Sequence, residues 1–192
     1  MYILLIGMIY LSVSWEWNWT LKSQTQNNNE TVLINKKNEQ KDIFTKYTSN
    51  TGSFEVMTPE PMEYSRTVSN ENGTKETIDA YKATLKNEDV IFMIIHDSFK
   101  WKLNLEWFSV KEVYDNFIKS YTIKETKSYK EINWEAHFEI LVEYEKQNIY
   151  FHGRIIKKNN NEVYSIYSAF SDSGSKDVAN KFINSFKFTW RN

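Results

Sequence analysis

The side chains whose types could do chemistry gather on one face of the segment from Trp134 to Phe170. Strand side chains alternate between the two faces of a sheet, so the register of neighbouring strands decides which of them meet. The register that we predict places five candidate ligand-binding residues on one face: Glu139, Tyr150, His152, Arg154 and Tyr167. We expect these side chains to line a small polar pocket, or to be held by an ordinary cross-strand ion pair between Glu139 and Arg154 worth roughly 0.2–1 kcal/mol.

Catalysis is the alternative use of this face. Glu139 and His152 are residue types that serve as acid and base in a small hydrolase-like enzyme. Such a pair needs shifted pKa values, which a sequence does not show. His96, Asp97 and Ser98 also have the residue types of a catalytic triad, but they are consecutive in a strand and point to alternating faces. We expect them where a strand ends and enters a loop, and we assign no catalytic residue.

The sequence predicts no metal site and no cofactor. His137 and His152 share a face, but the predicted register separates them by roughly 13 Å, too far for one ion. The 192-residue chain has no cysteine, and its 5 glycines form no phosphate-binding loop. A net charge of −1 without a basic block argues against a nucleic-acid partner. The expected partner is an unknown protein or a small molecule.

Two hairpins must position the candidate face. We predict three strands joined by turns at Glu145–Asn148 and Asn159-Asn160. In the first hairpin we expect Ile140 opposite Gly153, Phe138 opposite Ile155 and Glu139 opposite Arg154. In the second hairpin we expect Tyr167 opposite His152, with Tyr164, Ile166 and Phe170 on the same apolar face as Phe138.

The remaining pattern predicts further strands and two helices. The expected strands are Ile43–Tyr47, Ser53–Met57, Met62–Ser69, Thr74–Leu85, Val90–Ile95 and a polar edge strand at Thr122–Ile132. Apolar residues recur at helical spacing in Leu105–Tyr121 and Ser175–Phe186. The order of strands, helix, strands and helix predicts an α+β fold, in which two main helices flank an antiparallel sheet as an α/β/α sandwich.

The first 42 residues are expected to lie outside that domain. Met1–Ser14 is apolar and ends in small residues, as a secretory signal peptide does, and it is shorter than the about 20 residues of a transmembrane helix. Residues 15–42 are polar and predict a linker or a poorly ordered arm. Residues 43–192 then form a single domain of an exported protein, periplasmic or extracellular. In the alternative, the apolar N-terminus is the first core strand of a cytosolic interaction protein.

Two stretches resemble a known family. The stretch Gly52-Ser53-Phe54-Glu55-Val56-Met57-Thr58-Pro59 resembles the G-F-x-V-x-x-P opening of the PsbP-like superfamily, named for the photosystem II extrinsic subunit P, with Ser53 as an extra residue. Phe182-Ile183-Asn184-Ser185-Phe186 is similar to the closing F-x-x-S-F helix of that family. The resemblance implies an α/β/α sandwich and offers no catalytic residues. The function that it implies is that of an exported, non-catalytic binding or accessory module of the cell envelope.

Overall fold

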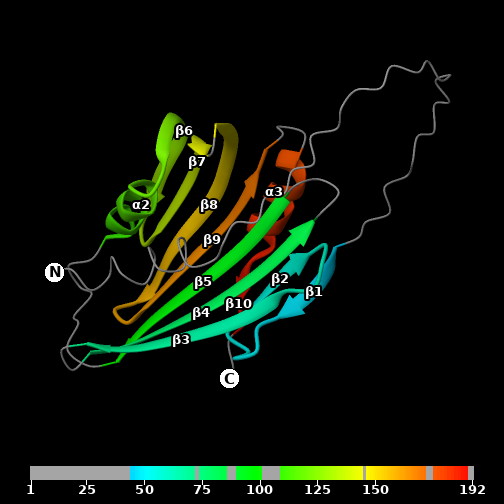
Figure 1. Ribbon diagram of the computed structural model, residues 1–192. Coiled ribbons are helices and arrows are strands. Elements are labelled where there is room, and N and C mark those ends of the chain that lie inside the picture. Colours follow the sequence, from blue (N-terminus) through cyan, green and yellow to red (C-terminus); the bar gives the residue numbers. More distant parts are fainter. Residues whose placement is uncertain are drawn as a thin grey trace, which may run out of the picture.

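Antiparallel β-sheet dominates the computed structural model, which describes residues 44–71, 74–85, 90–100, 109–144, 146–171 and 175–189 (Figure 1). The larger sheet has seven strands in the order β3-β4-β5-β9-β8-β7-β6. Their bounds are β3 Glu63–Glu71, β4 Thr74–Leu85, β5 Val90–Lys100, β6 Thr122–Ile132, β7 Glu135–Tyr144, β8 Gln147–Asn159 and β9 Glu162–Phe170. The predicted signal peptide and polar arm lie outside the described residues.

A smaller sheet and two helices complete the described structure. The small sheet has the order β1-β2-β10, with bounds β1 Thr45–Thr48, β2 Phe54–Thr58 and β10 Lys187–Phe188. The helices are α2 Val110–Ile118 and α3 Lys176–Ser185. Ser109 begins α2 with a capping box, in which its hydroxyl accepts from the Glu112 amide and the Glu112 carboxylate accepts from the Ser109 amide.

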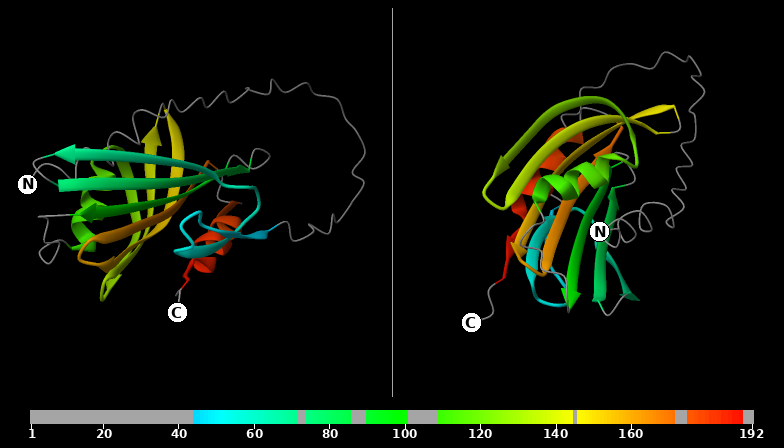
Figure 2. Two further views of the ribbon diagram at one scale, coloured as in Figure 1. Left: turned by 90° about the horizontal axis from the view of Figure 1, so that it is seen from below. Right: turned by 90° about the vertical axis from the view of Figure 1, so that its left-hand side faces the viewer.

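The predicted α+β class and its α/β/α sandwich are wrong. Strands hold 67% of the described residues and helices 16%. Helices of nine and ten residues make only two to three turns, so each covers only part of a sheet face. On the side of α3, the small sheet lies beside the helix and covers the large sheet together with it (Figure 2). The residues of the predicted first helix before Ser109 lie outside the described ranges.

Most strands form where the apolar pattern predicted them. The predicted bounds Thr74–Leu85 and Thr122–Ile132 are those of β4 and β6, and β6 is an edge strand as expected. β5 continues beyond Ile95 to Lys100, so the expectation that a strand ends at His96 is wrong. The ladder of hydrogen bonds to β4 and β9 carries the strand through these polar residues.

The first predicted hairpin, β7–β8, is displaced in register by two residues. Phe138 pairs with Gly153 and Glu139 with His152, because Tyr144 pairs with Gln147 and leaves a two-residue turn instead of four. Lys146 in this turn has a φ of 66°, a conformation for which lysine gives no sequence signal. A displacement by two keeps every β7 and β8 side chain on its predicted face.

The second predicted hairpin, β8–β9, is displaced by one residue, and this changes the face of β9. The pairing is irregular between Lys157 and Asn159, where an extra residue forms a bulge, so Tyr167 pairs with Gly153 instead of His152. A one-residue displacement turns every following side chain to the other face. Tyr164, Ile166 and Phe170 therefore lie opposite to Phe138, contrary to the prediction.

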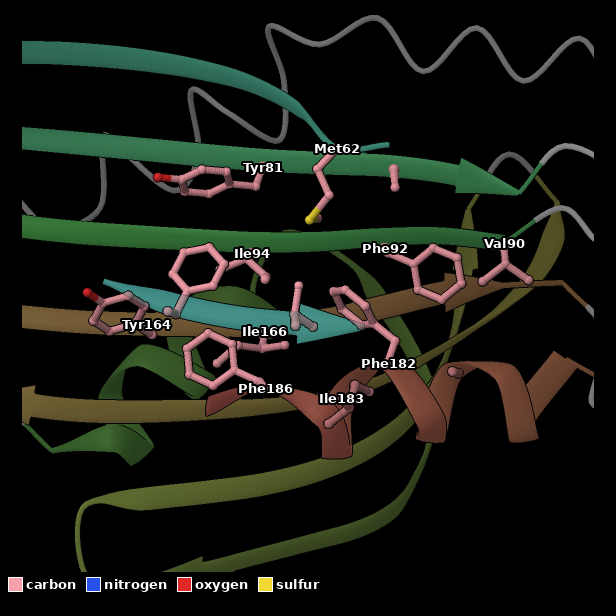
Figure 3. Close-up of a cluster of buried hydrophobic side chains, with 14 of the residues drawn as sticks. Met62, Tyr81, Val90, Phe92, Ile94, Tyr164, Ile166, Phe182, Ile183 and Phe186 are labelled. Carbon is pink, nitrogen blue, oxygen red and sulfur yellow. The ribbon is translucent and has the colours of Figure 1, made fainter. Parts of the chain in front are cut away.

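The large sheet has one apolar cluster on each face. On the α3 face, Phe182 and Phe186 pack with β5 and β9 side chains (Figure 3). Phe54 of the small sheet belongs to the same cluster. On the α2 face, Val113 and Tyr114 pack on a set of β7 and β8 side chains that includes Phe138, Ile140 and Phe151. β5 and β9 are thus buried on both faces, and the outer strands leave part of each face open to solvent.

Candidate functional site

Five side chains form a polar stripe along β7 and β8, on the α3 face of the sheet. We define the polar stripe as Glu135, His137 and Glu139 of β7 with His152 and Arg154 of β8. Strand pairing sets His137 opposite Arg154 and Glu139 opposite His152. Since α3 packs over β8 and β9, the β7 members of the polar stripe lie at the border of the covered area and are half-buried.

The predicted ion pair between Glu139 and Arg154 does not form. Arg154 donates from Nε to Glu135 Oε1 at 2.7 Å and from Nη1 to the Ile183 carbonyl of α3 at 3.2 Å. His137 Nε2 lies 2.5 Å from the same carboxylate oxygen. The two-residue displacement of β8 moves Arg154 away from Glu139. Lys176 of α3 binds Glu139 instead, with Nζ 2.8 and 3.0 Å from its two oxygens.

His152 lies between these two ion pairs. Burial is the main cause that lowers the pKa of His152; Glu139 raises this pKa, and Lys176 and His137 lower it further. Its imidazole is therefore neutral at pH 7. Nδ1 is buried without a hydrogen-bond partner in the described part of the chain. His152 is thus a neutral base without an evident proton donor.

The structure brings four of the five predicted site residues to one face. Glu139, His152 and Arg154 belong to the polar stripe, and Tyr150 lies further along β8, where it stacks on Phe170 with ring centroids 5.6 Å apart. Tyr167 lies on the opposite face because of the β8–β9 bulge. There it is buried, and its hydroxyl donates to Met93 Sδ at 2.9 Å.

A surface hollow opens at one end of the polar stripe. We call it the Trp134 hollow; its volume is about 330 Å³ and its lining residues are Ile132, Asn133, Trp134, Glu135, His137 and Ile156. Ile132 pairs with Glu135, so Asn133 and Trp134 form a two-residue turn in which Asn133 has a φ of 57°. The Trp134 side chain is 60% exposed and Ile132 is 49% exposed.

In the sequence, Trp134 is only the first residue of the predicted three-strand segment. The signal that could have identified its position is the preceding Asn133, since asparagine tolerates the positive φ that two-residue hairpin turns require. A tryptophan beside it at the tip of a hairpin cannot reach the core of the sheet. Its exposure follows from that position.

A second group of charged side chains crosses four strands at the other half of the sheet. Arg66 donates to Asp79 at 2.6 and 3.0 Å, and His96 lies 3.7 Å from Asp79 and 3.3 Å from Glu162. Burial alone would raise the pKa of Asp79, but Arg66 and Tyr64 hold it below its usual range. The close approach of His96 lowers the pKa of Glu162 to about 2. Both carboxylates are paired between strands, so we assign this group to sheet stability.

The register of β3 and β4 could have revealed part of this group. A two-residue turn at Asn72-Gly73 in the sequence sets Arg66 opposite Asp79, which is the observed pair. His96 and Asp97 point to opposite faces, as predicted, since His96 stacks on Tyr164 and Asp97 pairs with Ile78 and Val163 of the other cluster.

Comparisons with known proteins identify no family. No family model matches the chain, and no curated protein matches it. Among solved structures, a protein from Bacteroides thetaiotaomicron VPI-5482 is similar, with 12% identity and a TM-score of 0.41. The match covers 76% of this chain and 48% of that one, so the chain spans about half the length of that protein. A likeness this weak says nothing about function, and membership of the PsbP-like superfamily stays a prediction.

The described residues offer neither a membrane-spanning helix nor a cluster of metal ligands. They contain no helix that is both long enough and apolar enough to span a membrane. They also contain no group of three or more histidine, cysteine or acidic side chains arranged to hold a metal ion.

Proposed function

We propose that this protein is an exported, non-catalytic binding or accessory module of the cell envelope, and that its ligand binds in the Trp134 hollow. The observation that carries the proposal is a hollow of about 330 Å³ lined by Glu135 and His137, at a hairpin end where Trp134 is 60% exposed. Tryptophan is enriched among the residues that dominate binding energies, because it buries a large area at little conformational cost. The proposal of export rests on the apolar segment Met1–Ser14.

The polar stripe is arranged for binding more than for catalysis. Arg154 compensates the charge of Glu135, and Lys176 compensates that of Glu139. The oxygens that would take a proton from a substrate are already bound by these cations: Oε1 of Glu135 and both oxygens of Glu139. The same groups are good hydrogen-bonding partners for a polar ligand, because their positions are fixed before the ligand arrives.

One observation favours the hydrolase-like alternative. Strand pairing aligns Glu139, His152 and Ser168 on adjacent strands, and these are the residue types of an acid–histidine–serine triad. Ser168, however, is 0% exposed beneath α3, and in the described structure its hydroxyl makes no hydrogen bond to His152 or to another residue. A nucleophile must reach both its base and the substrate. The aligned residues meet neither condition.

The binding proposal is tested by mapping small-molecule fragments on the ¹⁵N-labelled protein by NMR. We expect fragments to shift the amide signals of residues 132–137, and Trp134→Ala to abolish these shifts. The matched control is Val68→Ala, since Val68 is an exposed apolar residue on the opposite edge strand, β3. Fragments that bind only elsewhere would contradict the proposal.

Catalysis and export are tested separately. Wild-type protein should not turn over p-nitrophenyl esters, glycosides or phosphates; turnover that Ser168→Ala removes would establish the alternative instead. Protein isolated from the native host should begin at or near Trp15 by mass spectrometry. Full-length protein retained in the cytoplasm would overturn the proposal of export.

A further inference from the structure

We infer that α3 is an acid-released lid: a proton on His152 weakens the ion pair that holds the first turn of the helix, and that end of the helix then lifts from the apolar cluster beneath it. This device is independent of the Trp134 hollow. It depends on how the two ends of α3 are fastened, on the charges around His152 and on the surface that the helix covers.

The two ends of α3 are fastened differently. At the C-terminal end, the Met57 amide donates to Ser185 Oγ at 2.8 Å, and the chain continues at once into β10, which pairs with β2. At the N-terminal end, Ser175 provides no side-chain cap, and Lys176 Nζ lies 2.8 and 3.0 Å from the two oxygens of Glu139 on β7. The Lys176 side chain is 46% exposed. Strand pairing thus anchors one end of the helix, whereas a partly exposed ion pair holds the other.

His152 lies directly beside this ion pair. It pairs across the strands with Glu139 on one side and with Ser168 of β9, which is uncharged, on the other. The titratable and charged side chains on the elements around His152 are Glu135, His137 and Glu139 of β7, Tyr150 and Arg154 of β8, and Lys176 of α3.

The charges of this group balance only while His152 is neutral. Glu135 binds Arg154, and Glu139 binds Lys176, so each carboxylate already has a cation. A proton on His152 adds a third positive charge, and its direct neighbour Glu139 would then be shared with Lys176. Protonation therefore weakens the contact that holds the first turn of α3.

Acid should favour the open position of the lid. Burial is the main cause that holds the pKa of His152 below its ordinary value of 6.5, and Lys176 contributes to this lowering. When the first turn lifts, the imidazole regains water and loses the nearby charge of Lys176, so its pKa returns toward 6.5. The open state then binds the proton more tightly. As the pH falls below 6.5, the equilibrium shifts toward opening by up to about tenfold per pH unit, until the pKa of the closed state is reached.

The surface beneath the lid is apolar and closely packed. Ala179 and Phe182 of α3 are both 0% exposed, and the Phe182 ring lies 4.9 Å from that of Phe92 on β5, between centroids (Figure 3). Ala179 is nearer to the N-terminal end of the helix, so lifting of the first turns exposes its position first. The chain has no cysteine, so a single thiol introduced at this position reports opening without background.

The test uses the full chain with one reporter thiol, introduced by Ala179→Cys. Ala169→Cys in β9 is the matched control, because Ala169 is also 0% exposed but belongs to the cluster on the α2 face. The rate of reaction with 4,4′-dithiodipyridine is divided by the rate for the urea-unfolded chain at the same pH, which removes the pH dependence of the thiol itself. From pH 7.5 to pH 5.5 we expect this ratio to rise severalfold, up to about tenfold, at position 179 and not to rise at position 169.

Further variants identify the group that takes up the proton. His152→Gln should abolish the rise at position 179, whereas His137→Gln, which removes the half-buried imidazole beside Glu135, should leave most of it. If circular dichroism shows that His152→Gln is unfolded, Lys176→Met replaces it: Glu139 is then free to pair with a protonated His152, so the rise should be smaller. Hydrogen exchange of the unmodified chain provides a measurement without a thiol, since the amides of the first turns of α3 should lose protection at pH 5.5 relative to those of β5.

The outcomes are distinct. An equal rise at positions 179 and 169 would show general unfolding in acid and would overturn the inference. No rise at position 179 would overturn it as well, and so would a full rise in His152→Gln or in Lys176→Met. None of these results depends on whether the Trp134 hollow binds a ligand, so the proposed function stands or falls separately.

Discussion

Asp97 of β5 is a buried carboxyl whose ionised form is unfavourable in the folded state. Its side chain is 4% exposed, and Oδ1 has no hydrogen-bond partner in the described structure. Burial, with a contribution from the neighbouring Glu76, raises the pKa of Asp97 from 3.8 to about 8. Ionisation of this carboxyl therefore opposes folding.

The pH dependence of stability should reveal this effect. Because the pKa is raised in the folded state, Asp97 has no effect on the free energy of unfolding below about pH 4 and lowers it as the pH rises to about 8. We expect Asp97→Asn to be more stable than wild type at pH 8, on the order of 1–3 kcal/mol, with the difference vanishing near pH 4. Urea unfolding at several pH values measures it. A difference that does not depend on pH would contradict this account.

Close packing, and not an unusual backbone conformation, is the reason why position 153 of β8 requires glycine. A Cβ atom at this position would lie 2.5 Å from Cζ of Phe138 and 3.0 Å from the Ile166 carbonyl oxygen. The Phe138 ring is itself buried against Tyr114 and Phe117, so it cannot move aside freely. We expect Gly153→Ala to destabilise the protein by about 1–3 kcal/mol in urea unfolding. If contact with the Phe138 ring is the cause, Gly153→Ala should destabilise a Phe138→Leu variant less than it destabilises wild type. Equal destabilisation in the two backgrounds would contradict this explanation.

At the scale of elements, the two turns of β8 show what the sequence could predict. The alternation of β7 and β8 identified both faces, and four of the five candidate residues lie together as predicted. The two-residue displacement of β8 against β7 left the side chains of both strands on their predicted faces. The bulge between Lys157 and Asn159, by contrast, turned Tyr167 to the other face. Lys157, Lys158 and Asn159 are all polar, so no apolar alternation in this stretch marks the inserted residue. The sequence therefore could not locate it.

The same elements determine which ion pairs couple. Glu135 and Arg154 are in direct contact, whereas Glu139 binds Lys176, so we expect a coupling energy of about 0.5–1 kcal/mol between Glu135→Gln and Arg154→Leu. Glu139→Gln and Arg154→Leu should be additive within about 0.3–0.5 kcal/mol. Urea unfolding of the single and double mutants provides both values. Coupling in the second pair alone would mean that β8 has the register predicted from the sequence.

At the scale of the whole molecule, the predicted fold class was wrong because strands that are far apart in the sequence can pair without any local sequence signal. The sequence predicted the apolar faces of both helices and the burial of β5 on both of its faces. The small sheet was not, since β2 pairs with β10 more than a hundred residues later, through Phe54 and Phe188. That sheet takes the place beside α3 that a longer helix would occupy in an α/β/α sandwich.

The two apolar clusters share the central strands, and this should make unfolding a single event. Phe182 packs on Phe92 of β5 on one face, and Phe138 packs on Phe117 of α2 on the other. We expect Phe182→Ala and Phe138→Ala each to lower the free energy of unfolding by about 3–5 kcal/mol, since each leaves a cavity. Val68→Ala, at a 48% exposed side chain, should change it by less than about 0.5 kcal/mol.

Because β5, β8 and β9 contribute side chains to both clusters, loss of one cluster exposes strands that the other needs. Circular dichroism and tryptophan fluorescence should therefore give coincident urea transitions for wild type and for both core variants. A biphasic curve in which Phe182→Ala shifts one phase and Phe138→Ala the other would show two independent units. In that case the seven-stranded sheet would not couple its two faces, and the shared strands would have to be stable without either cluster.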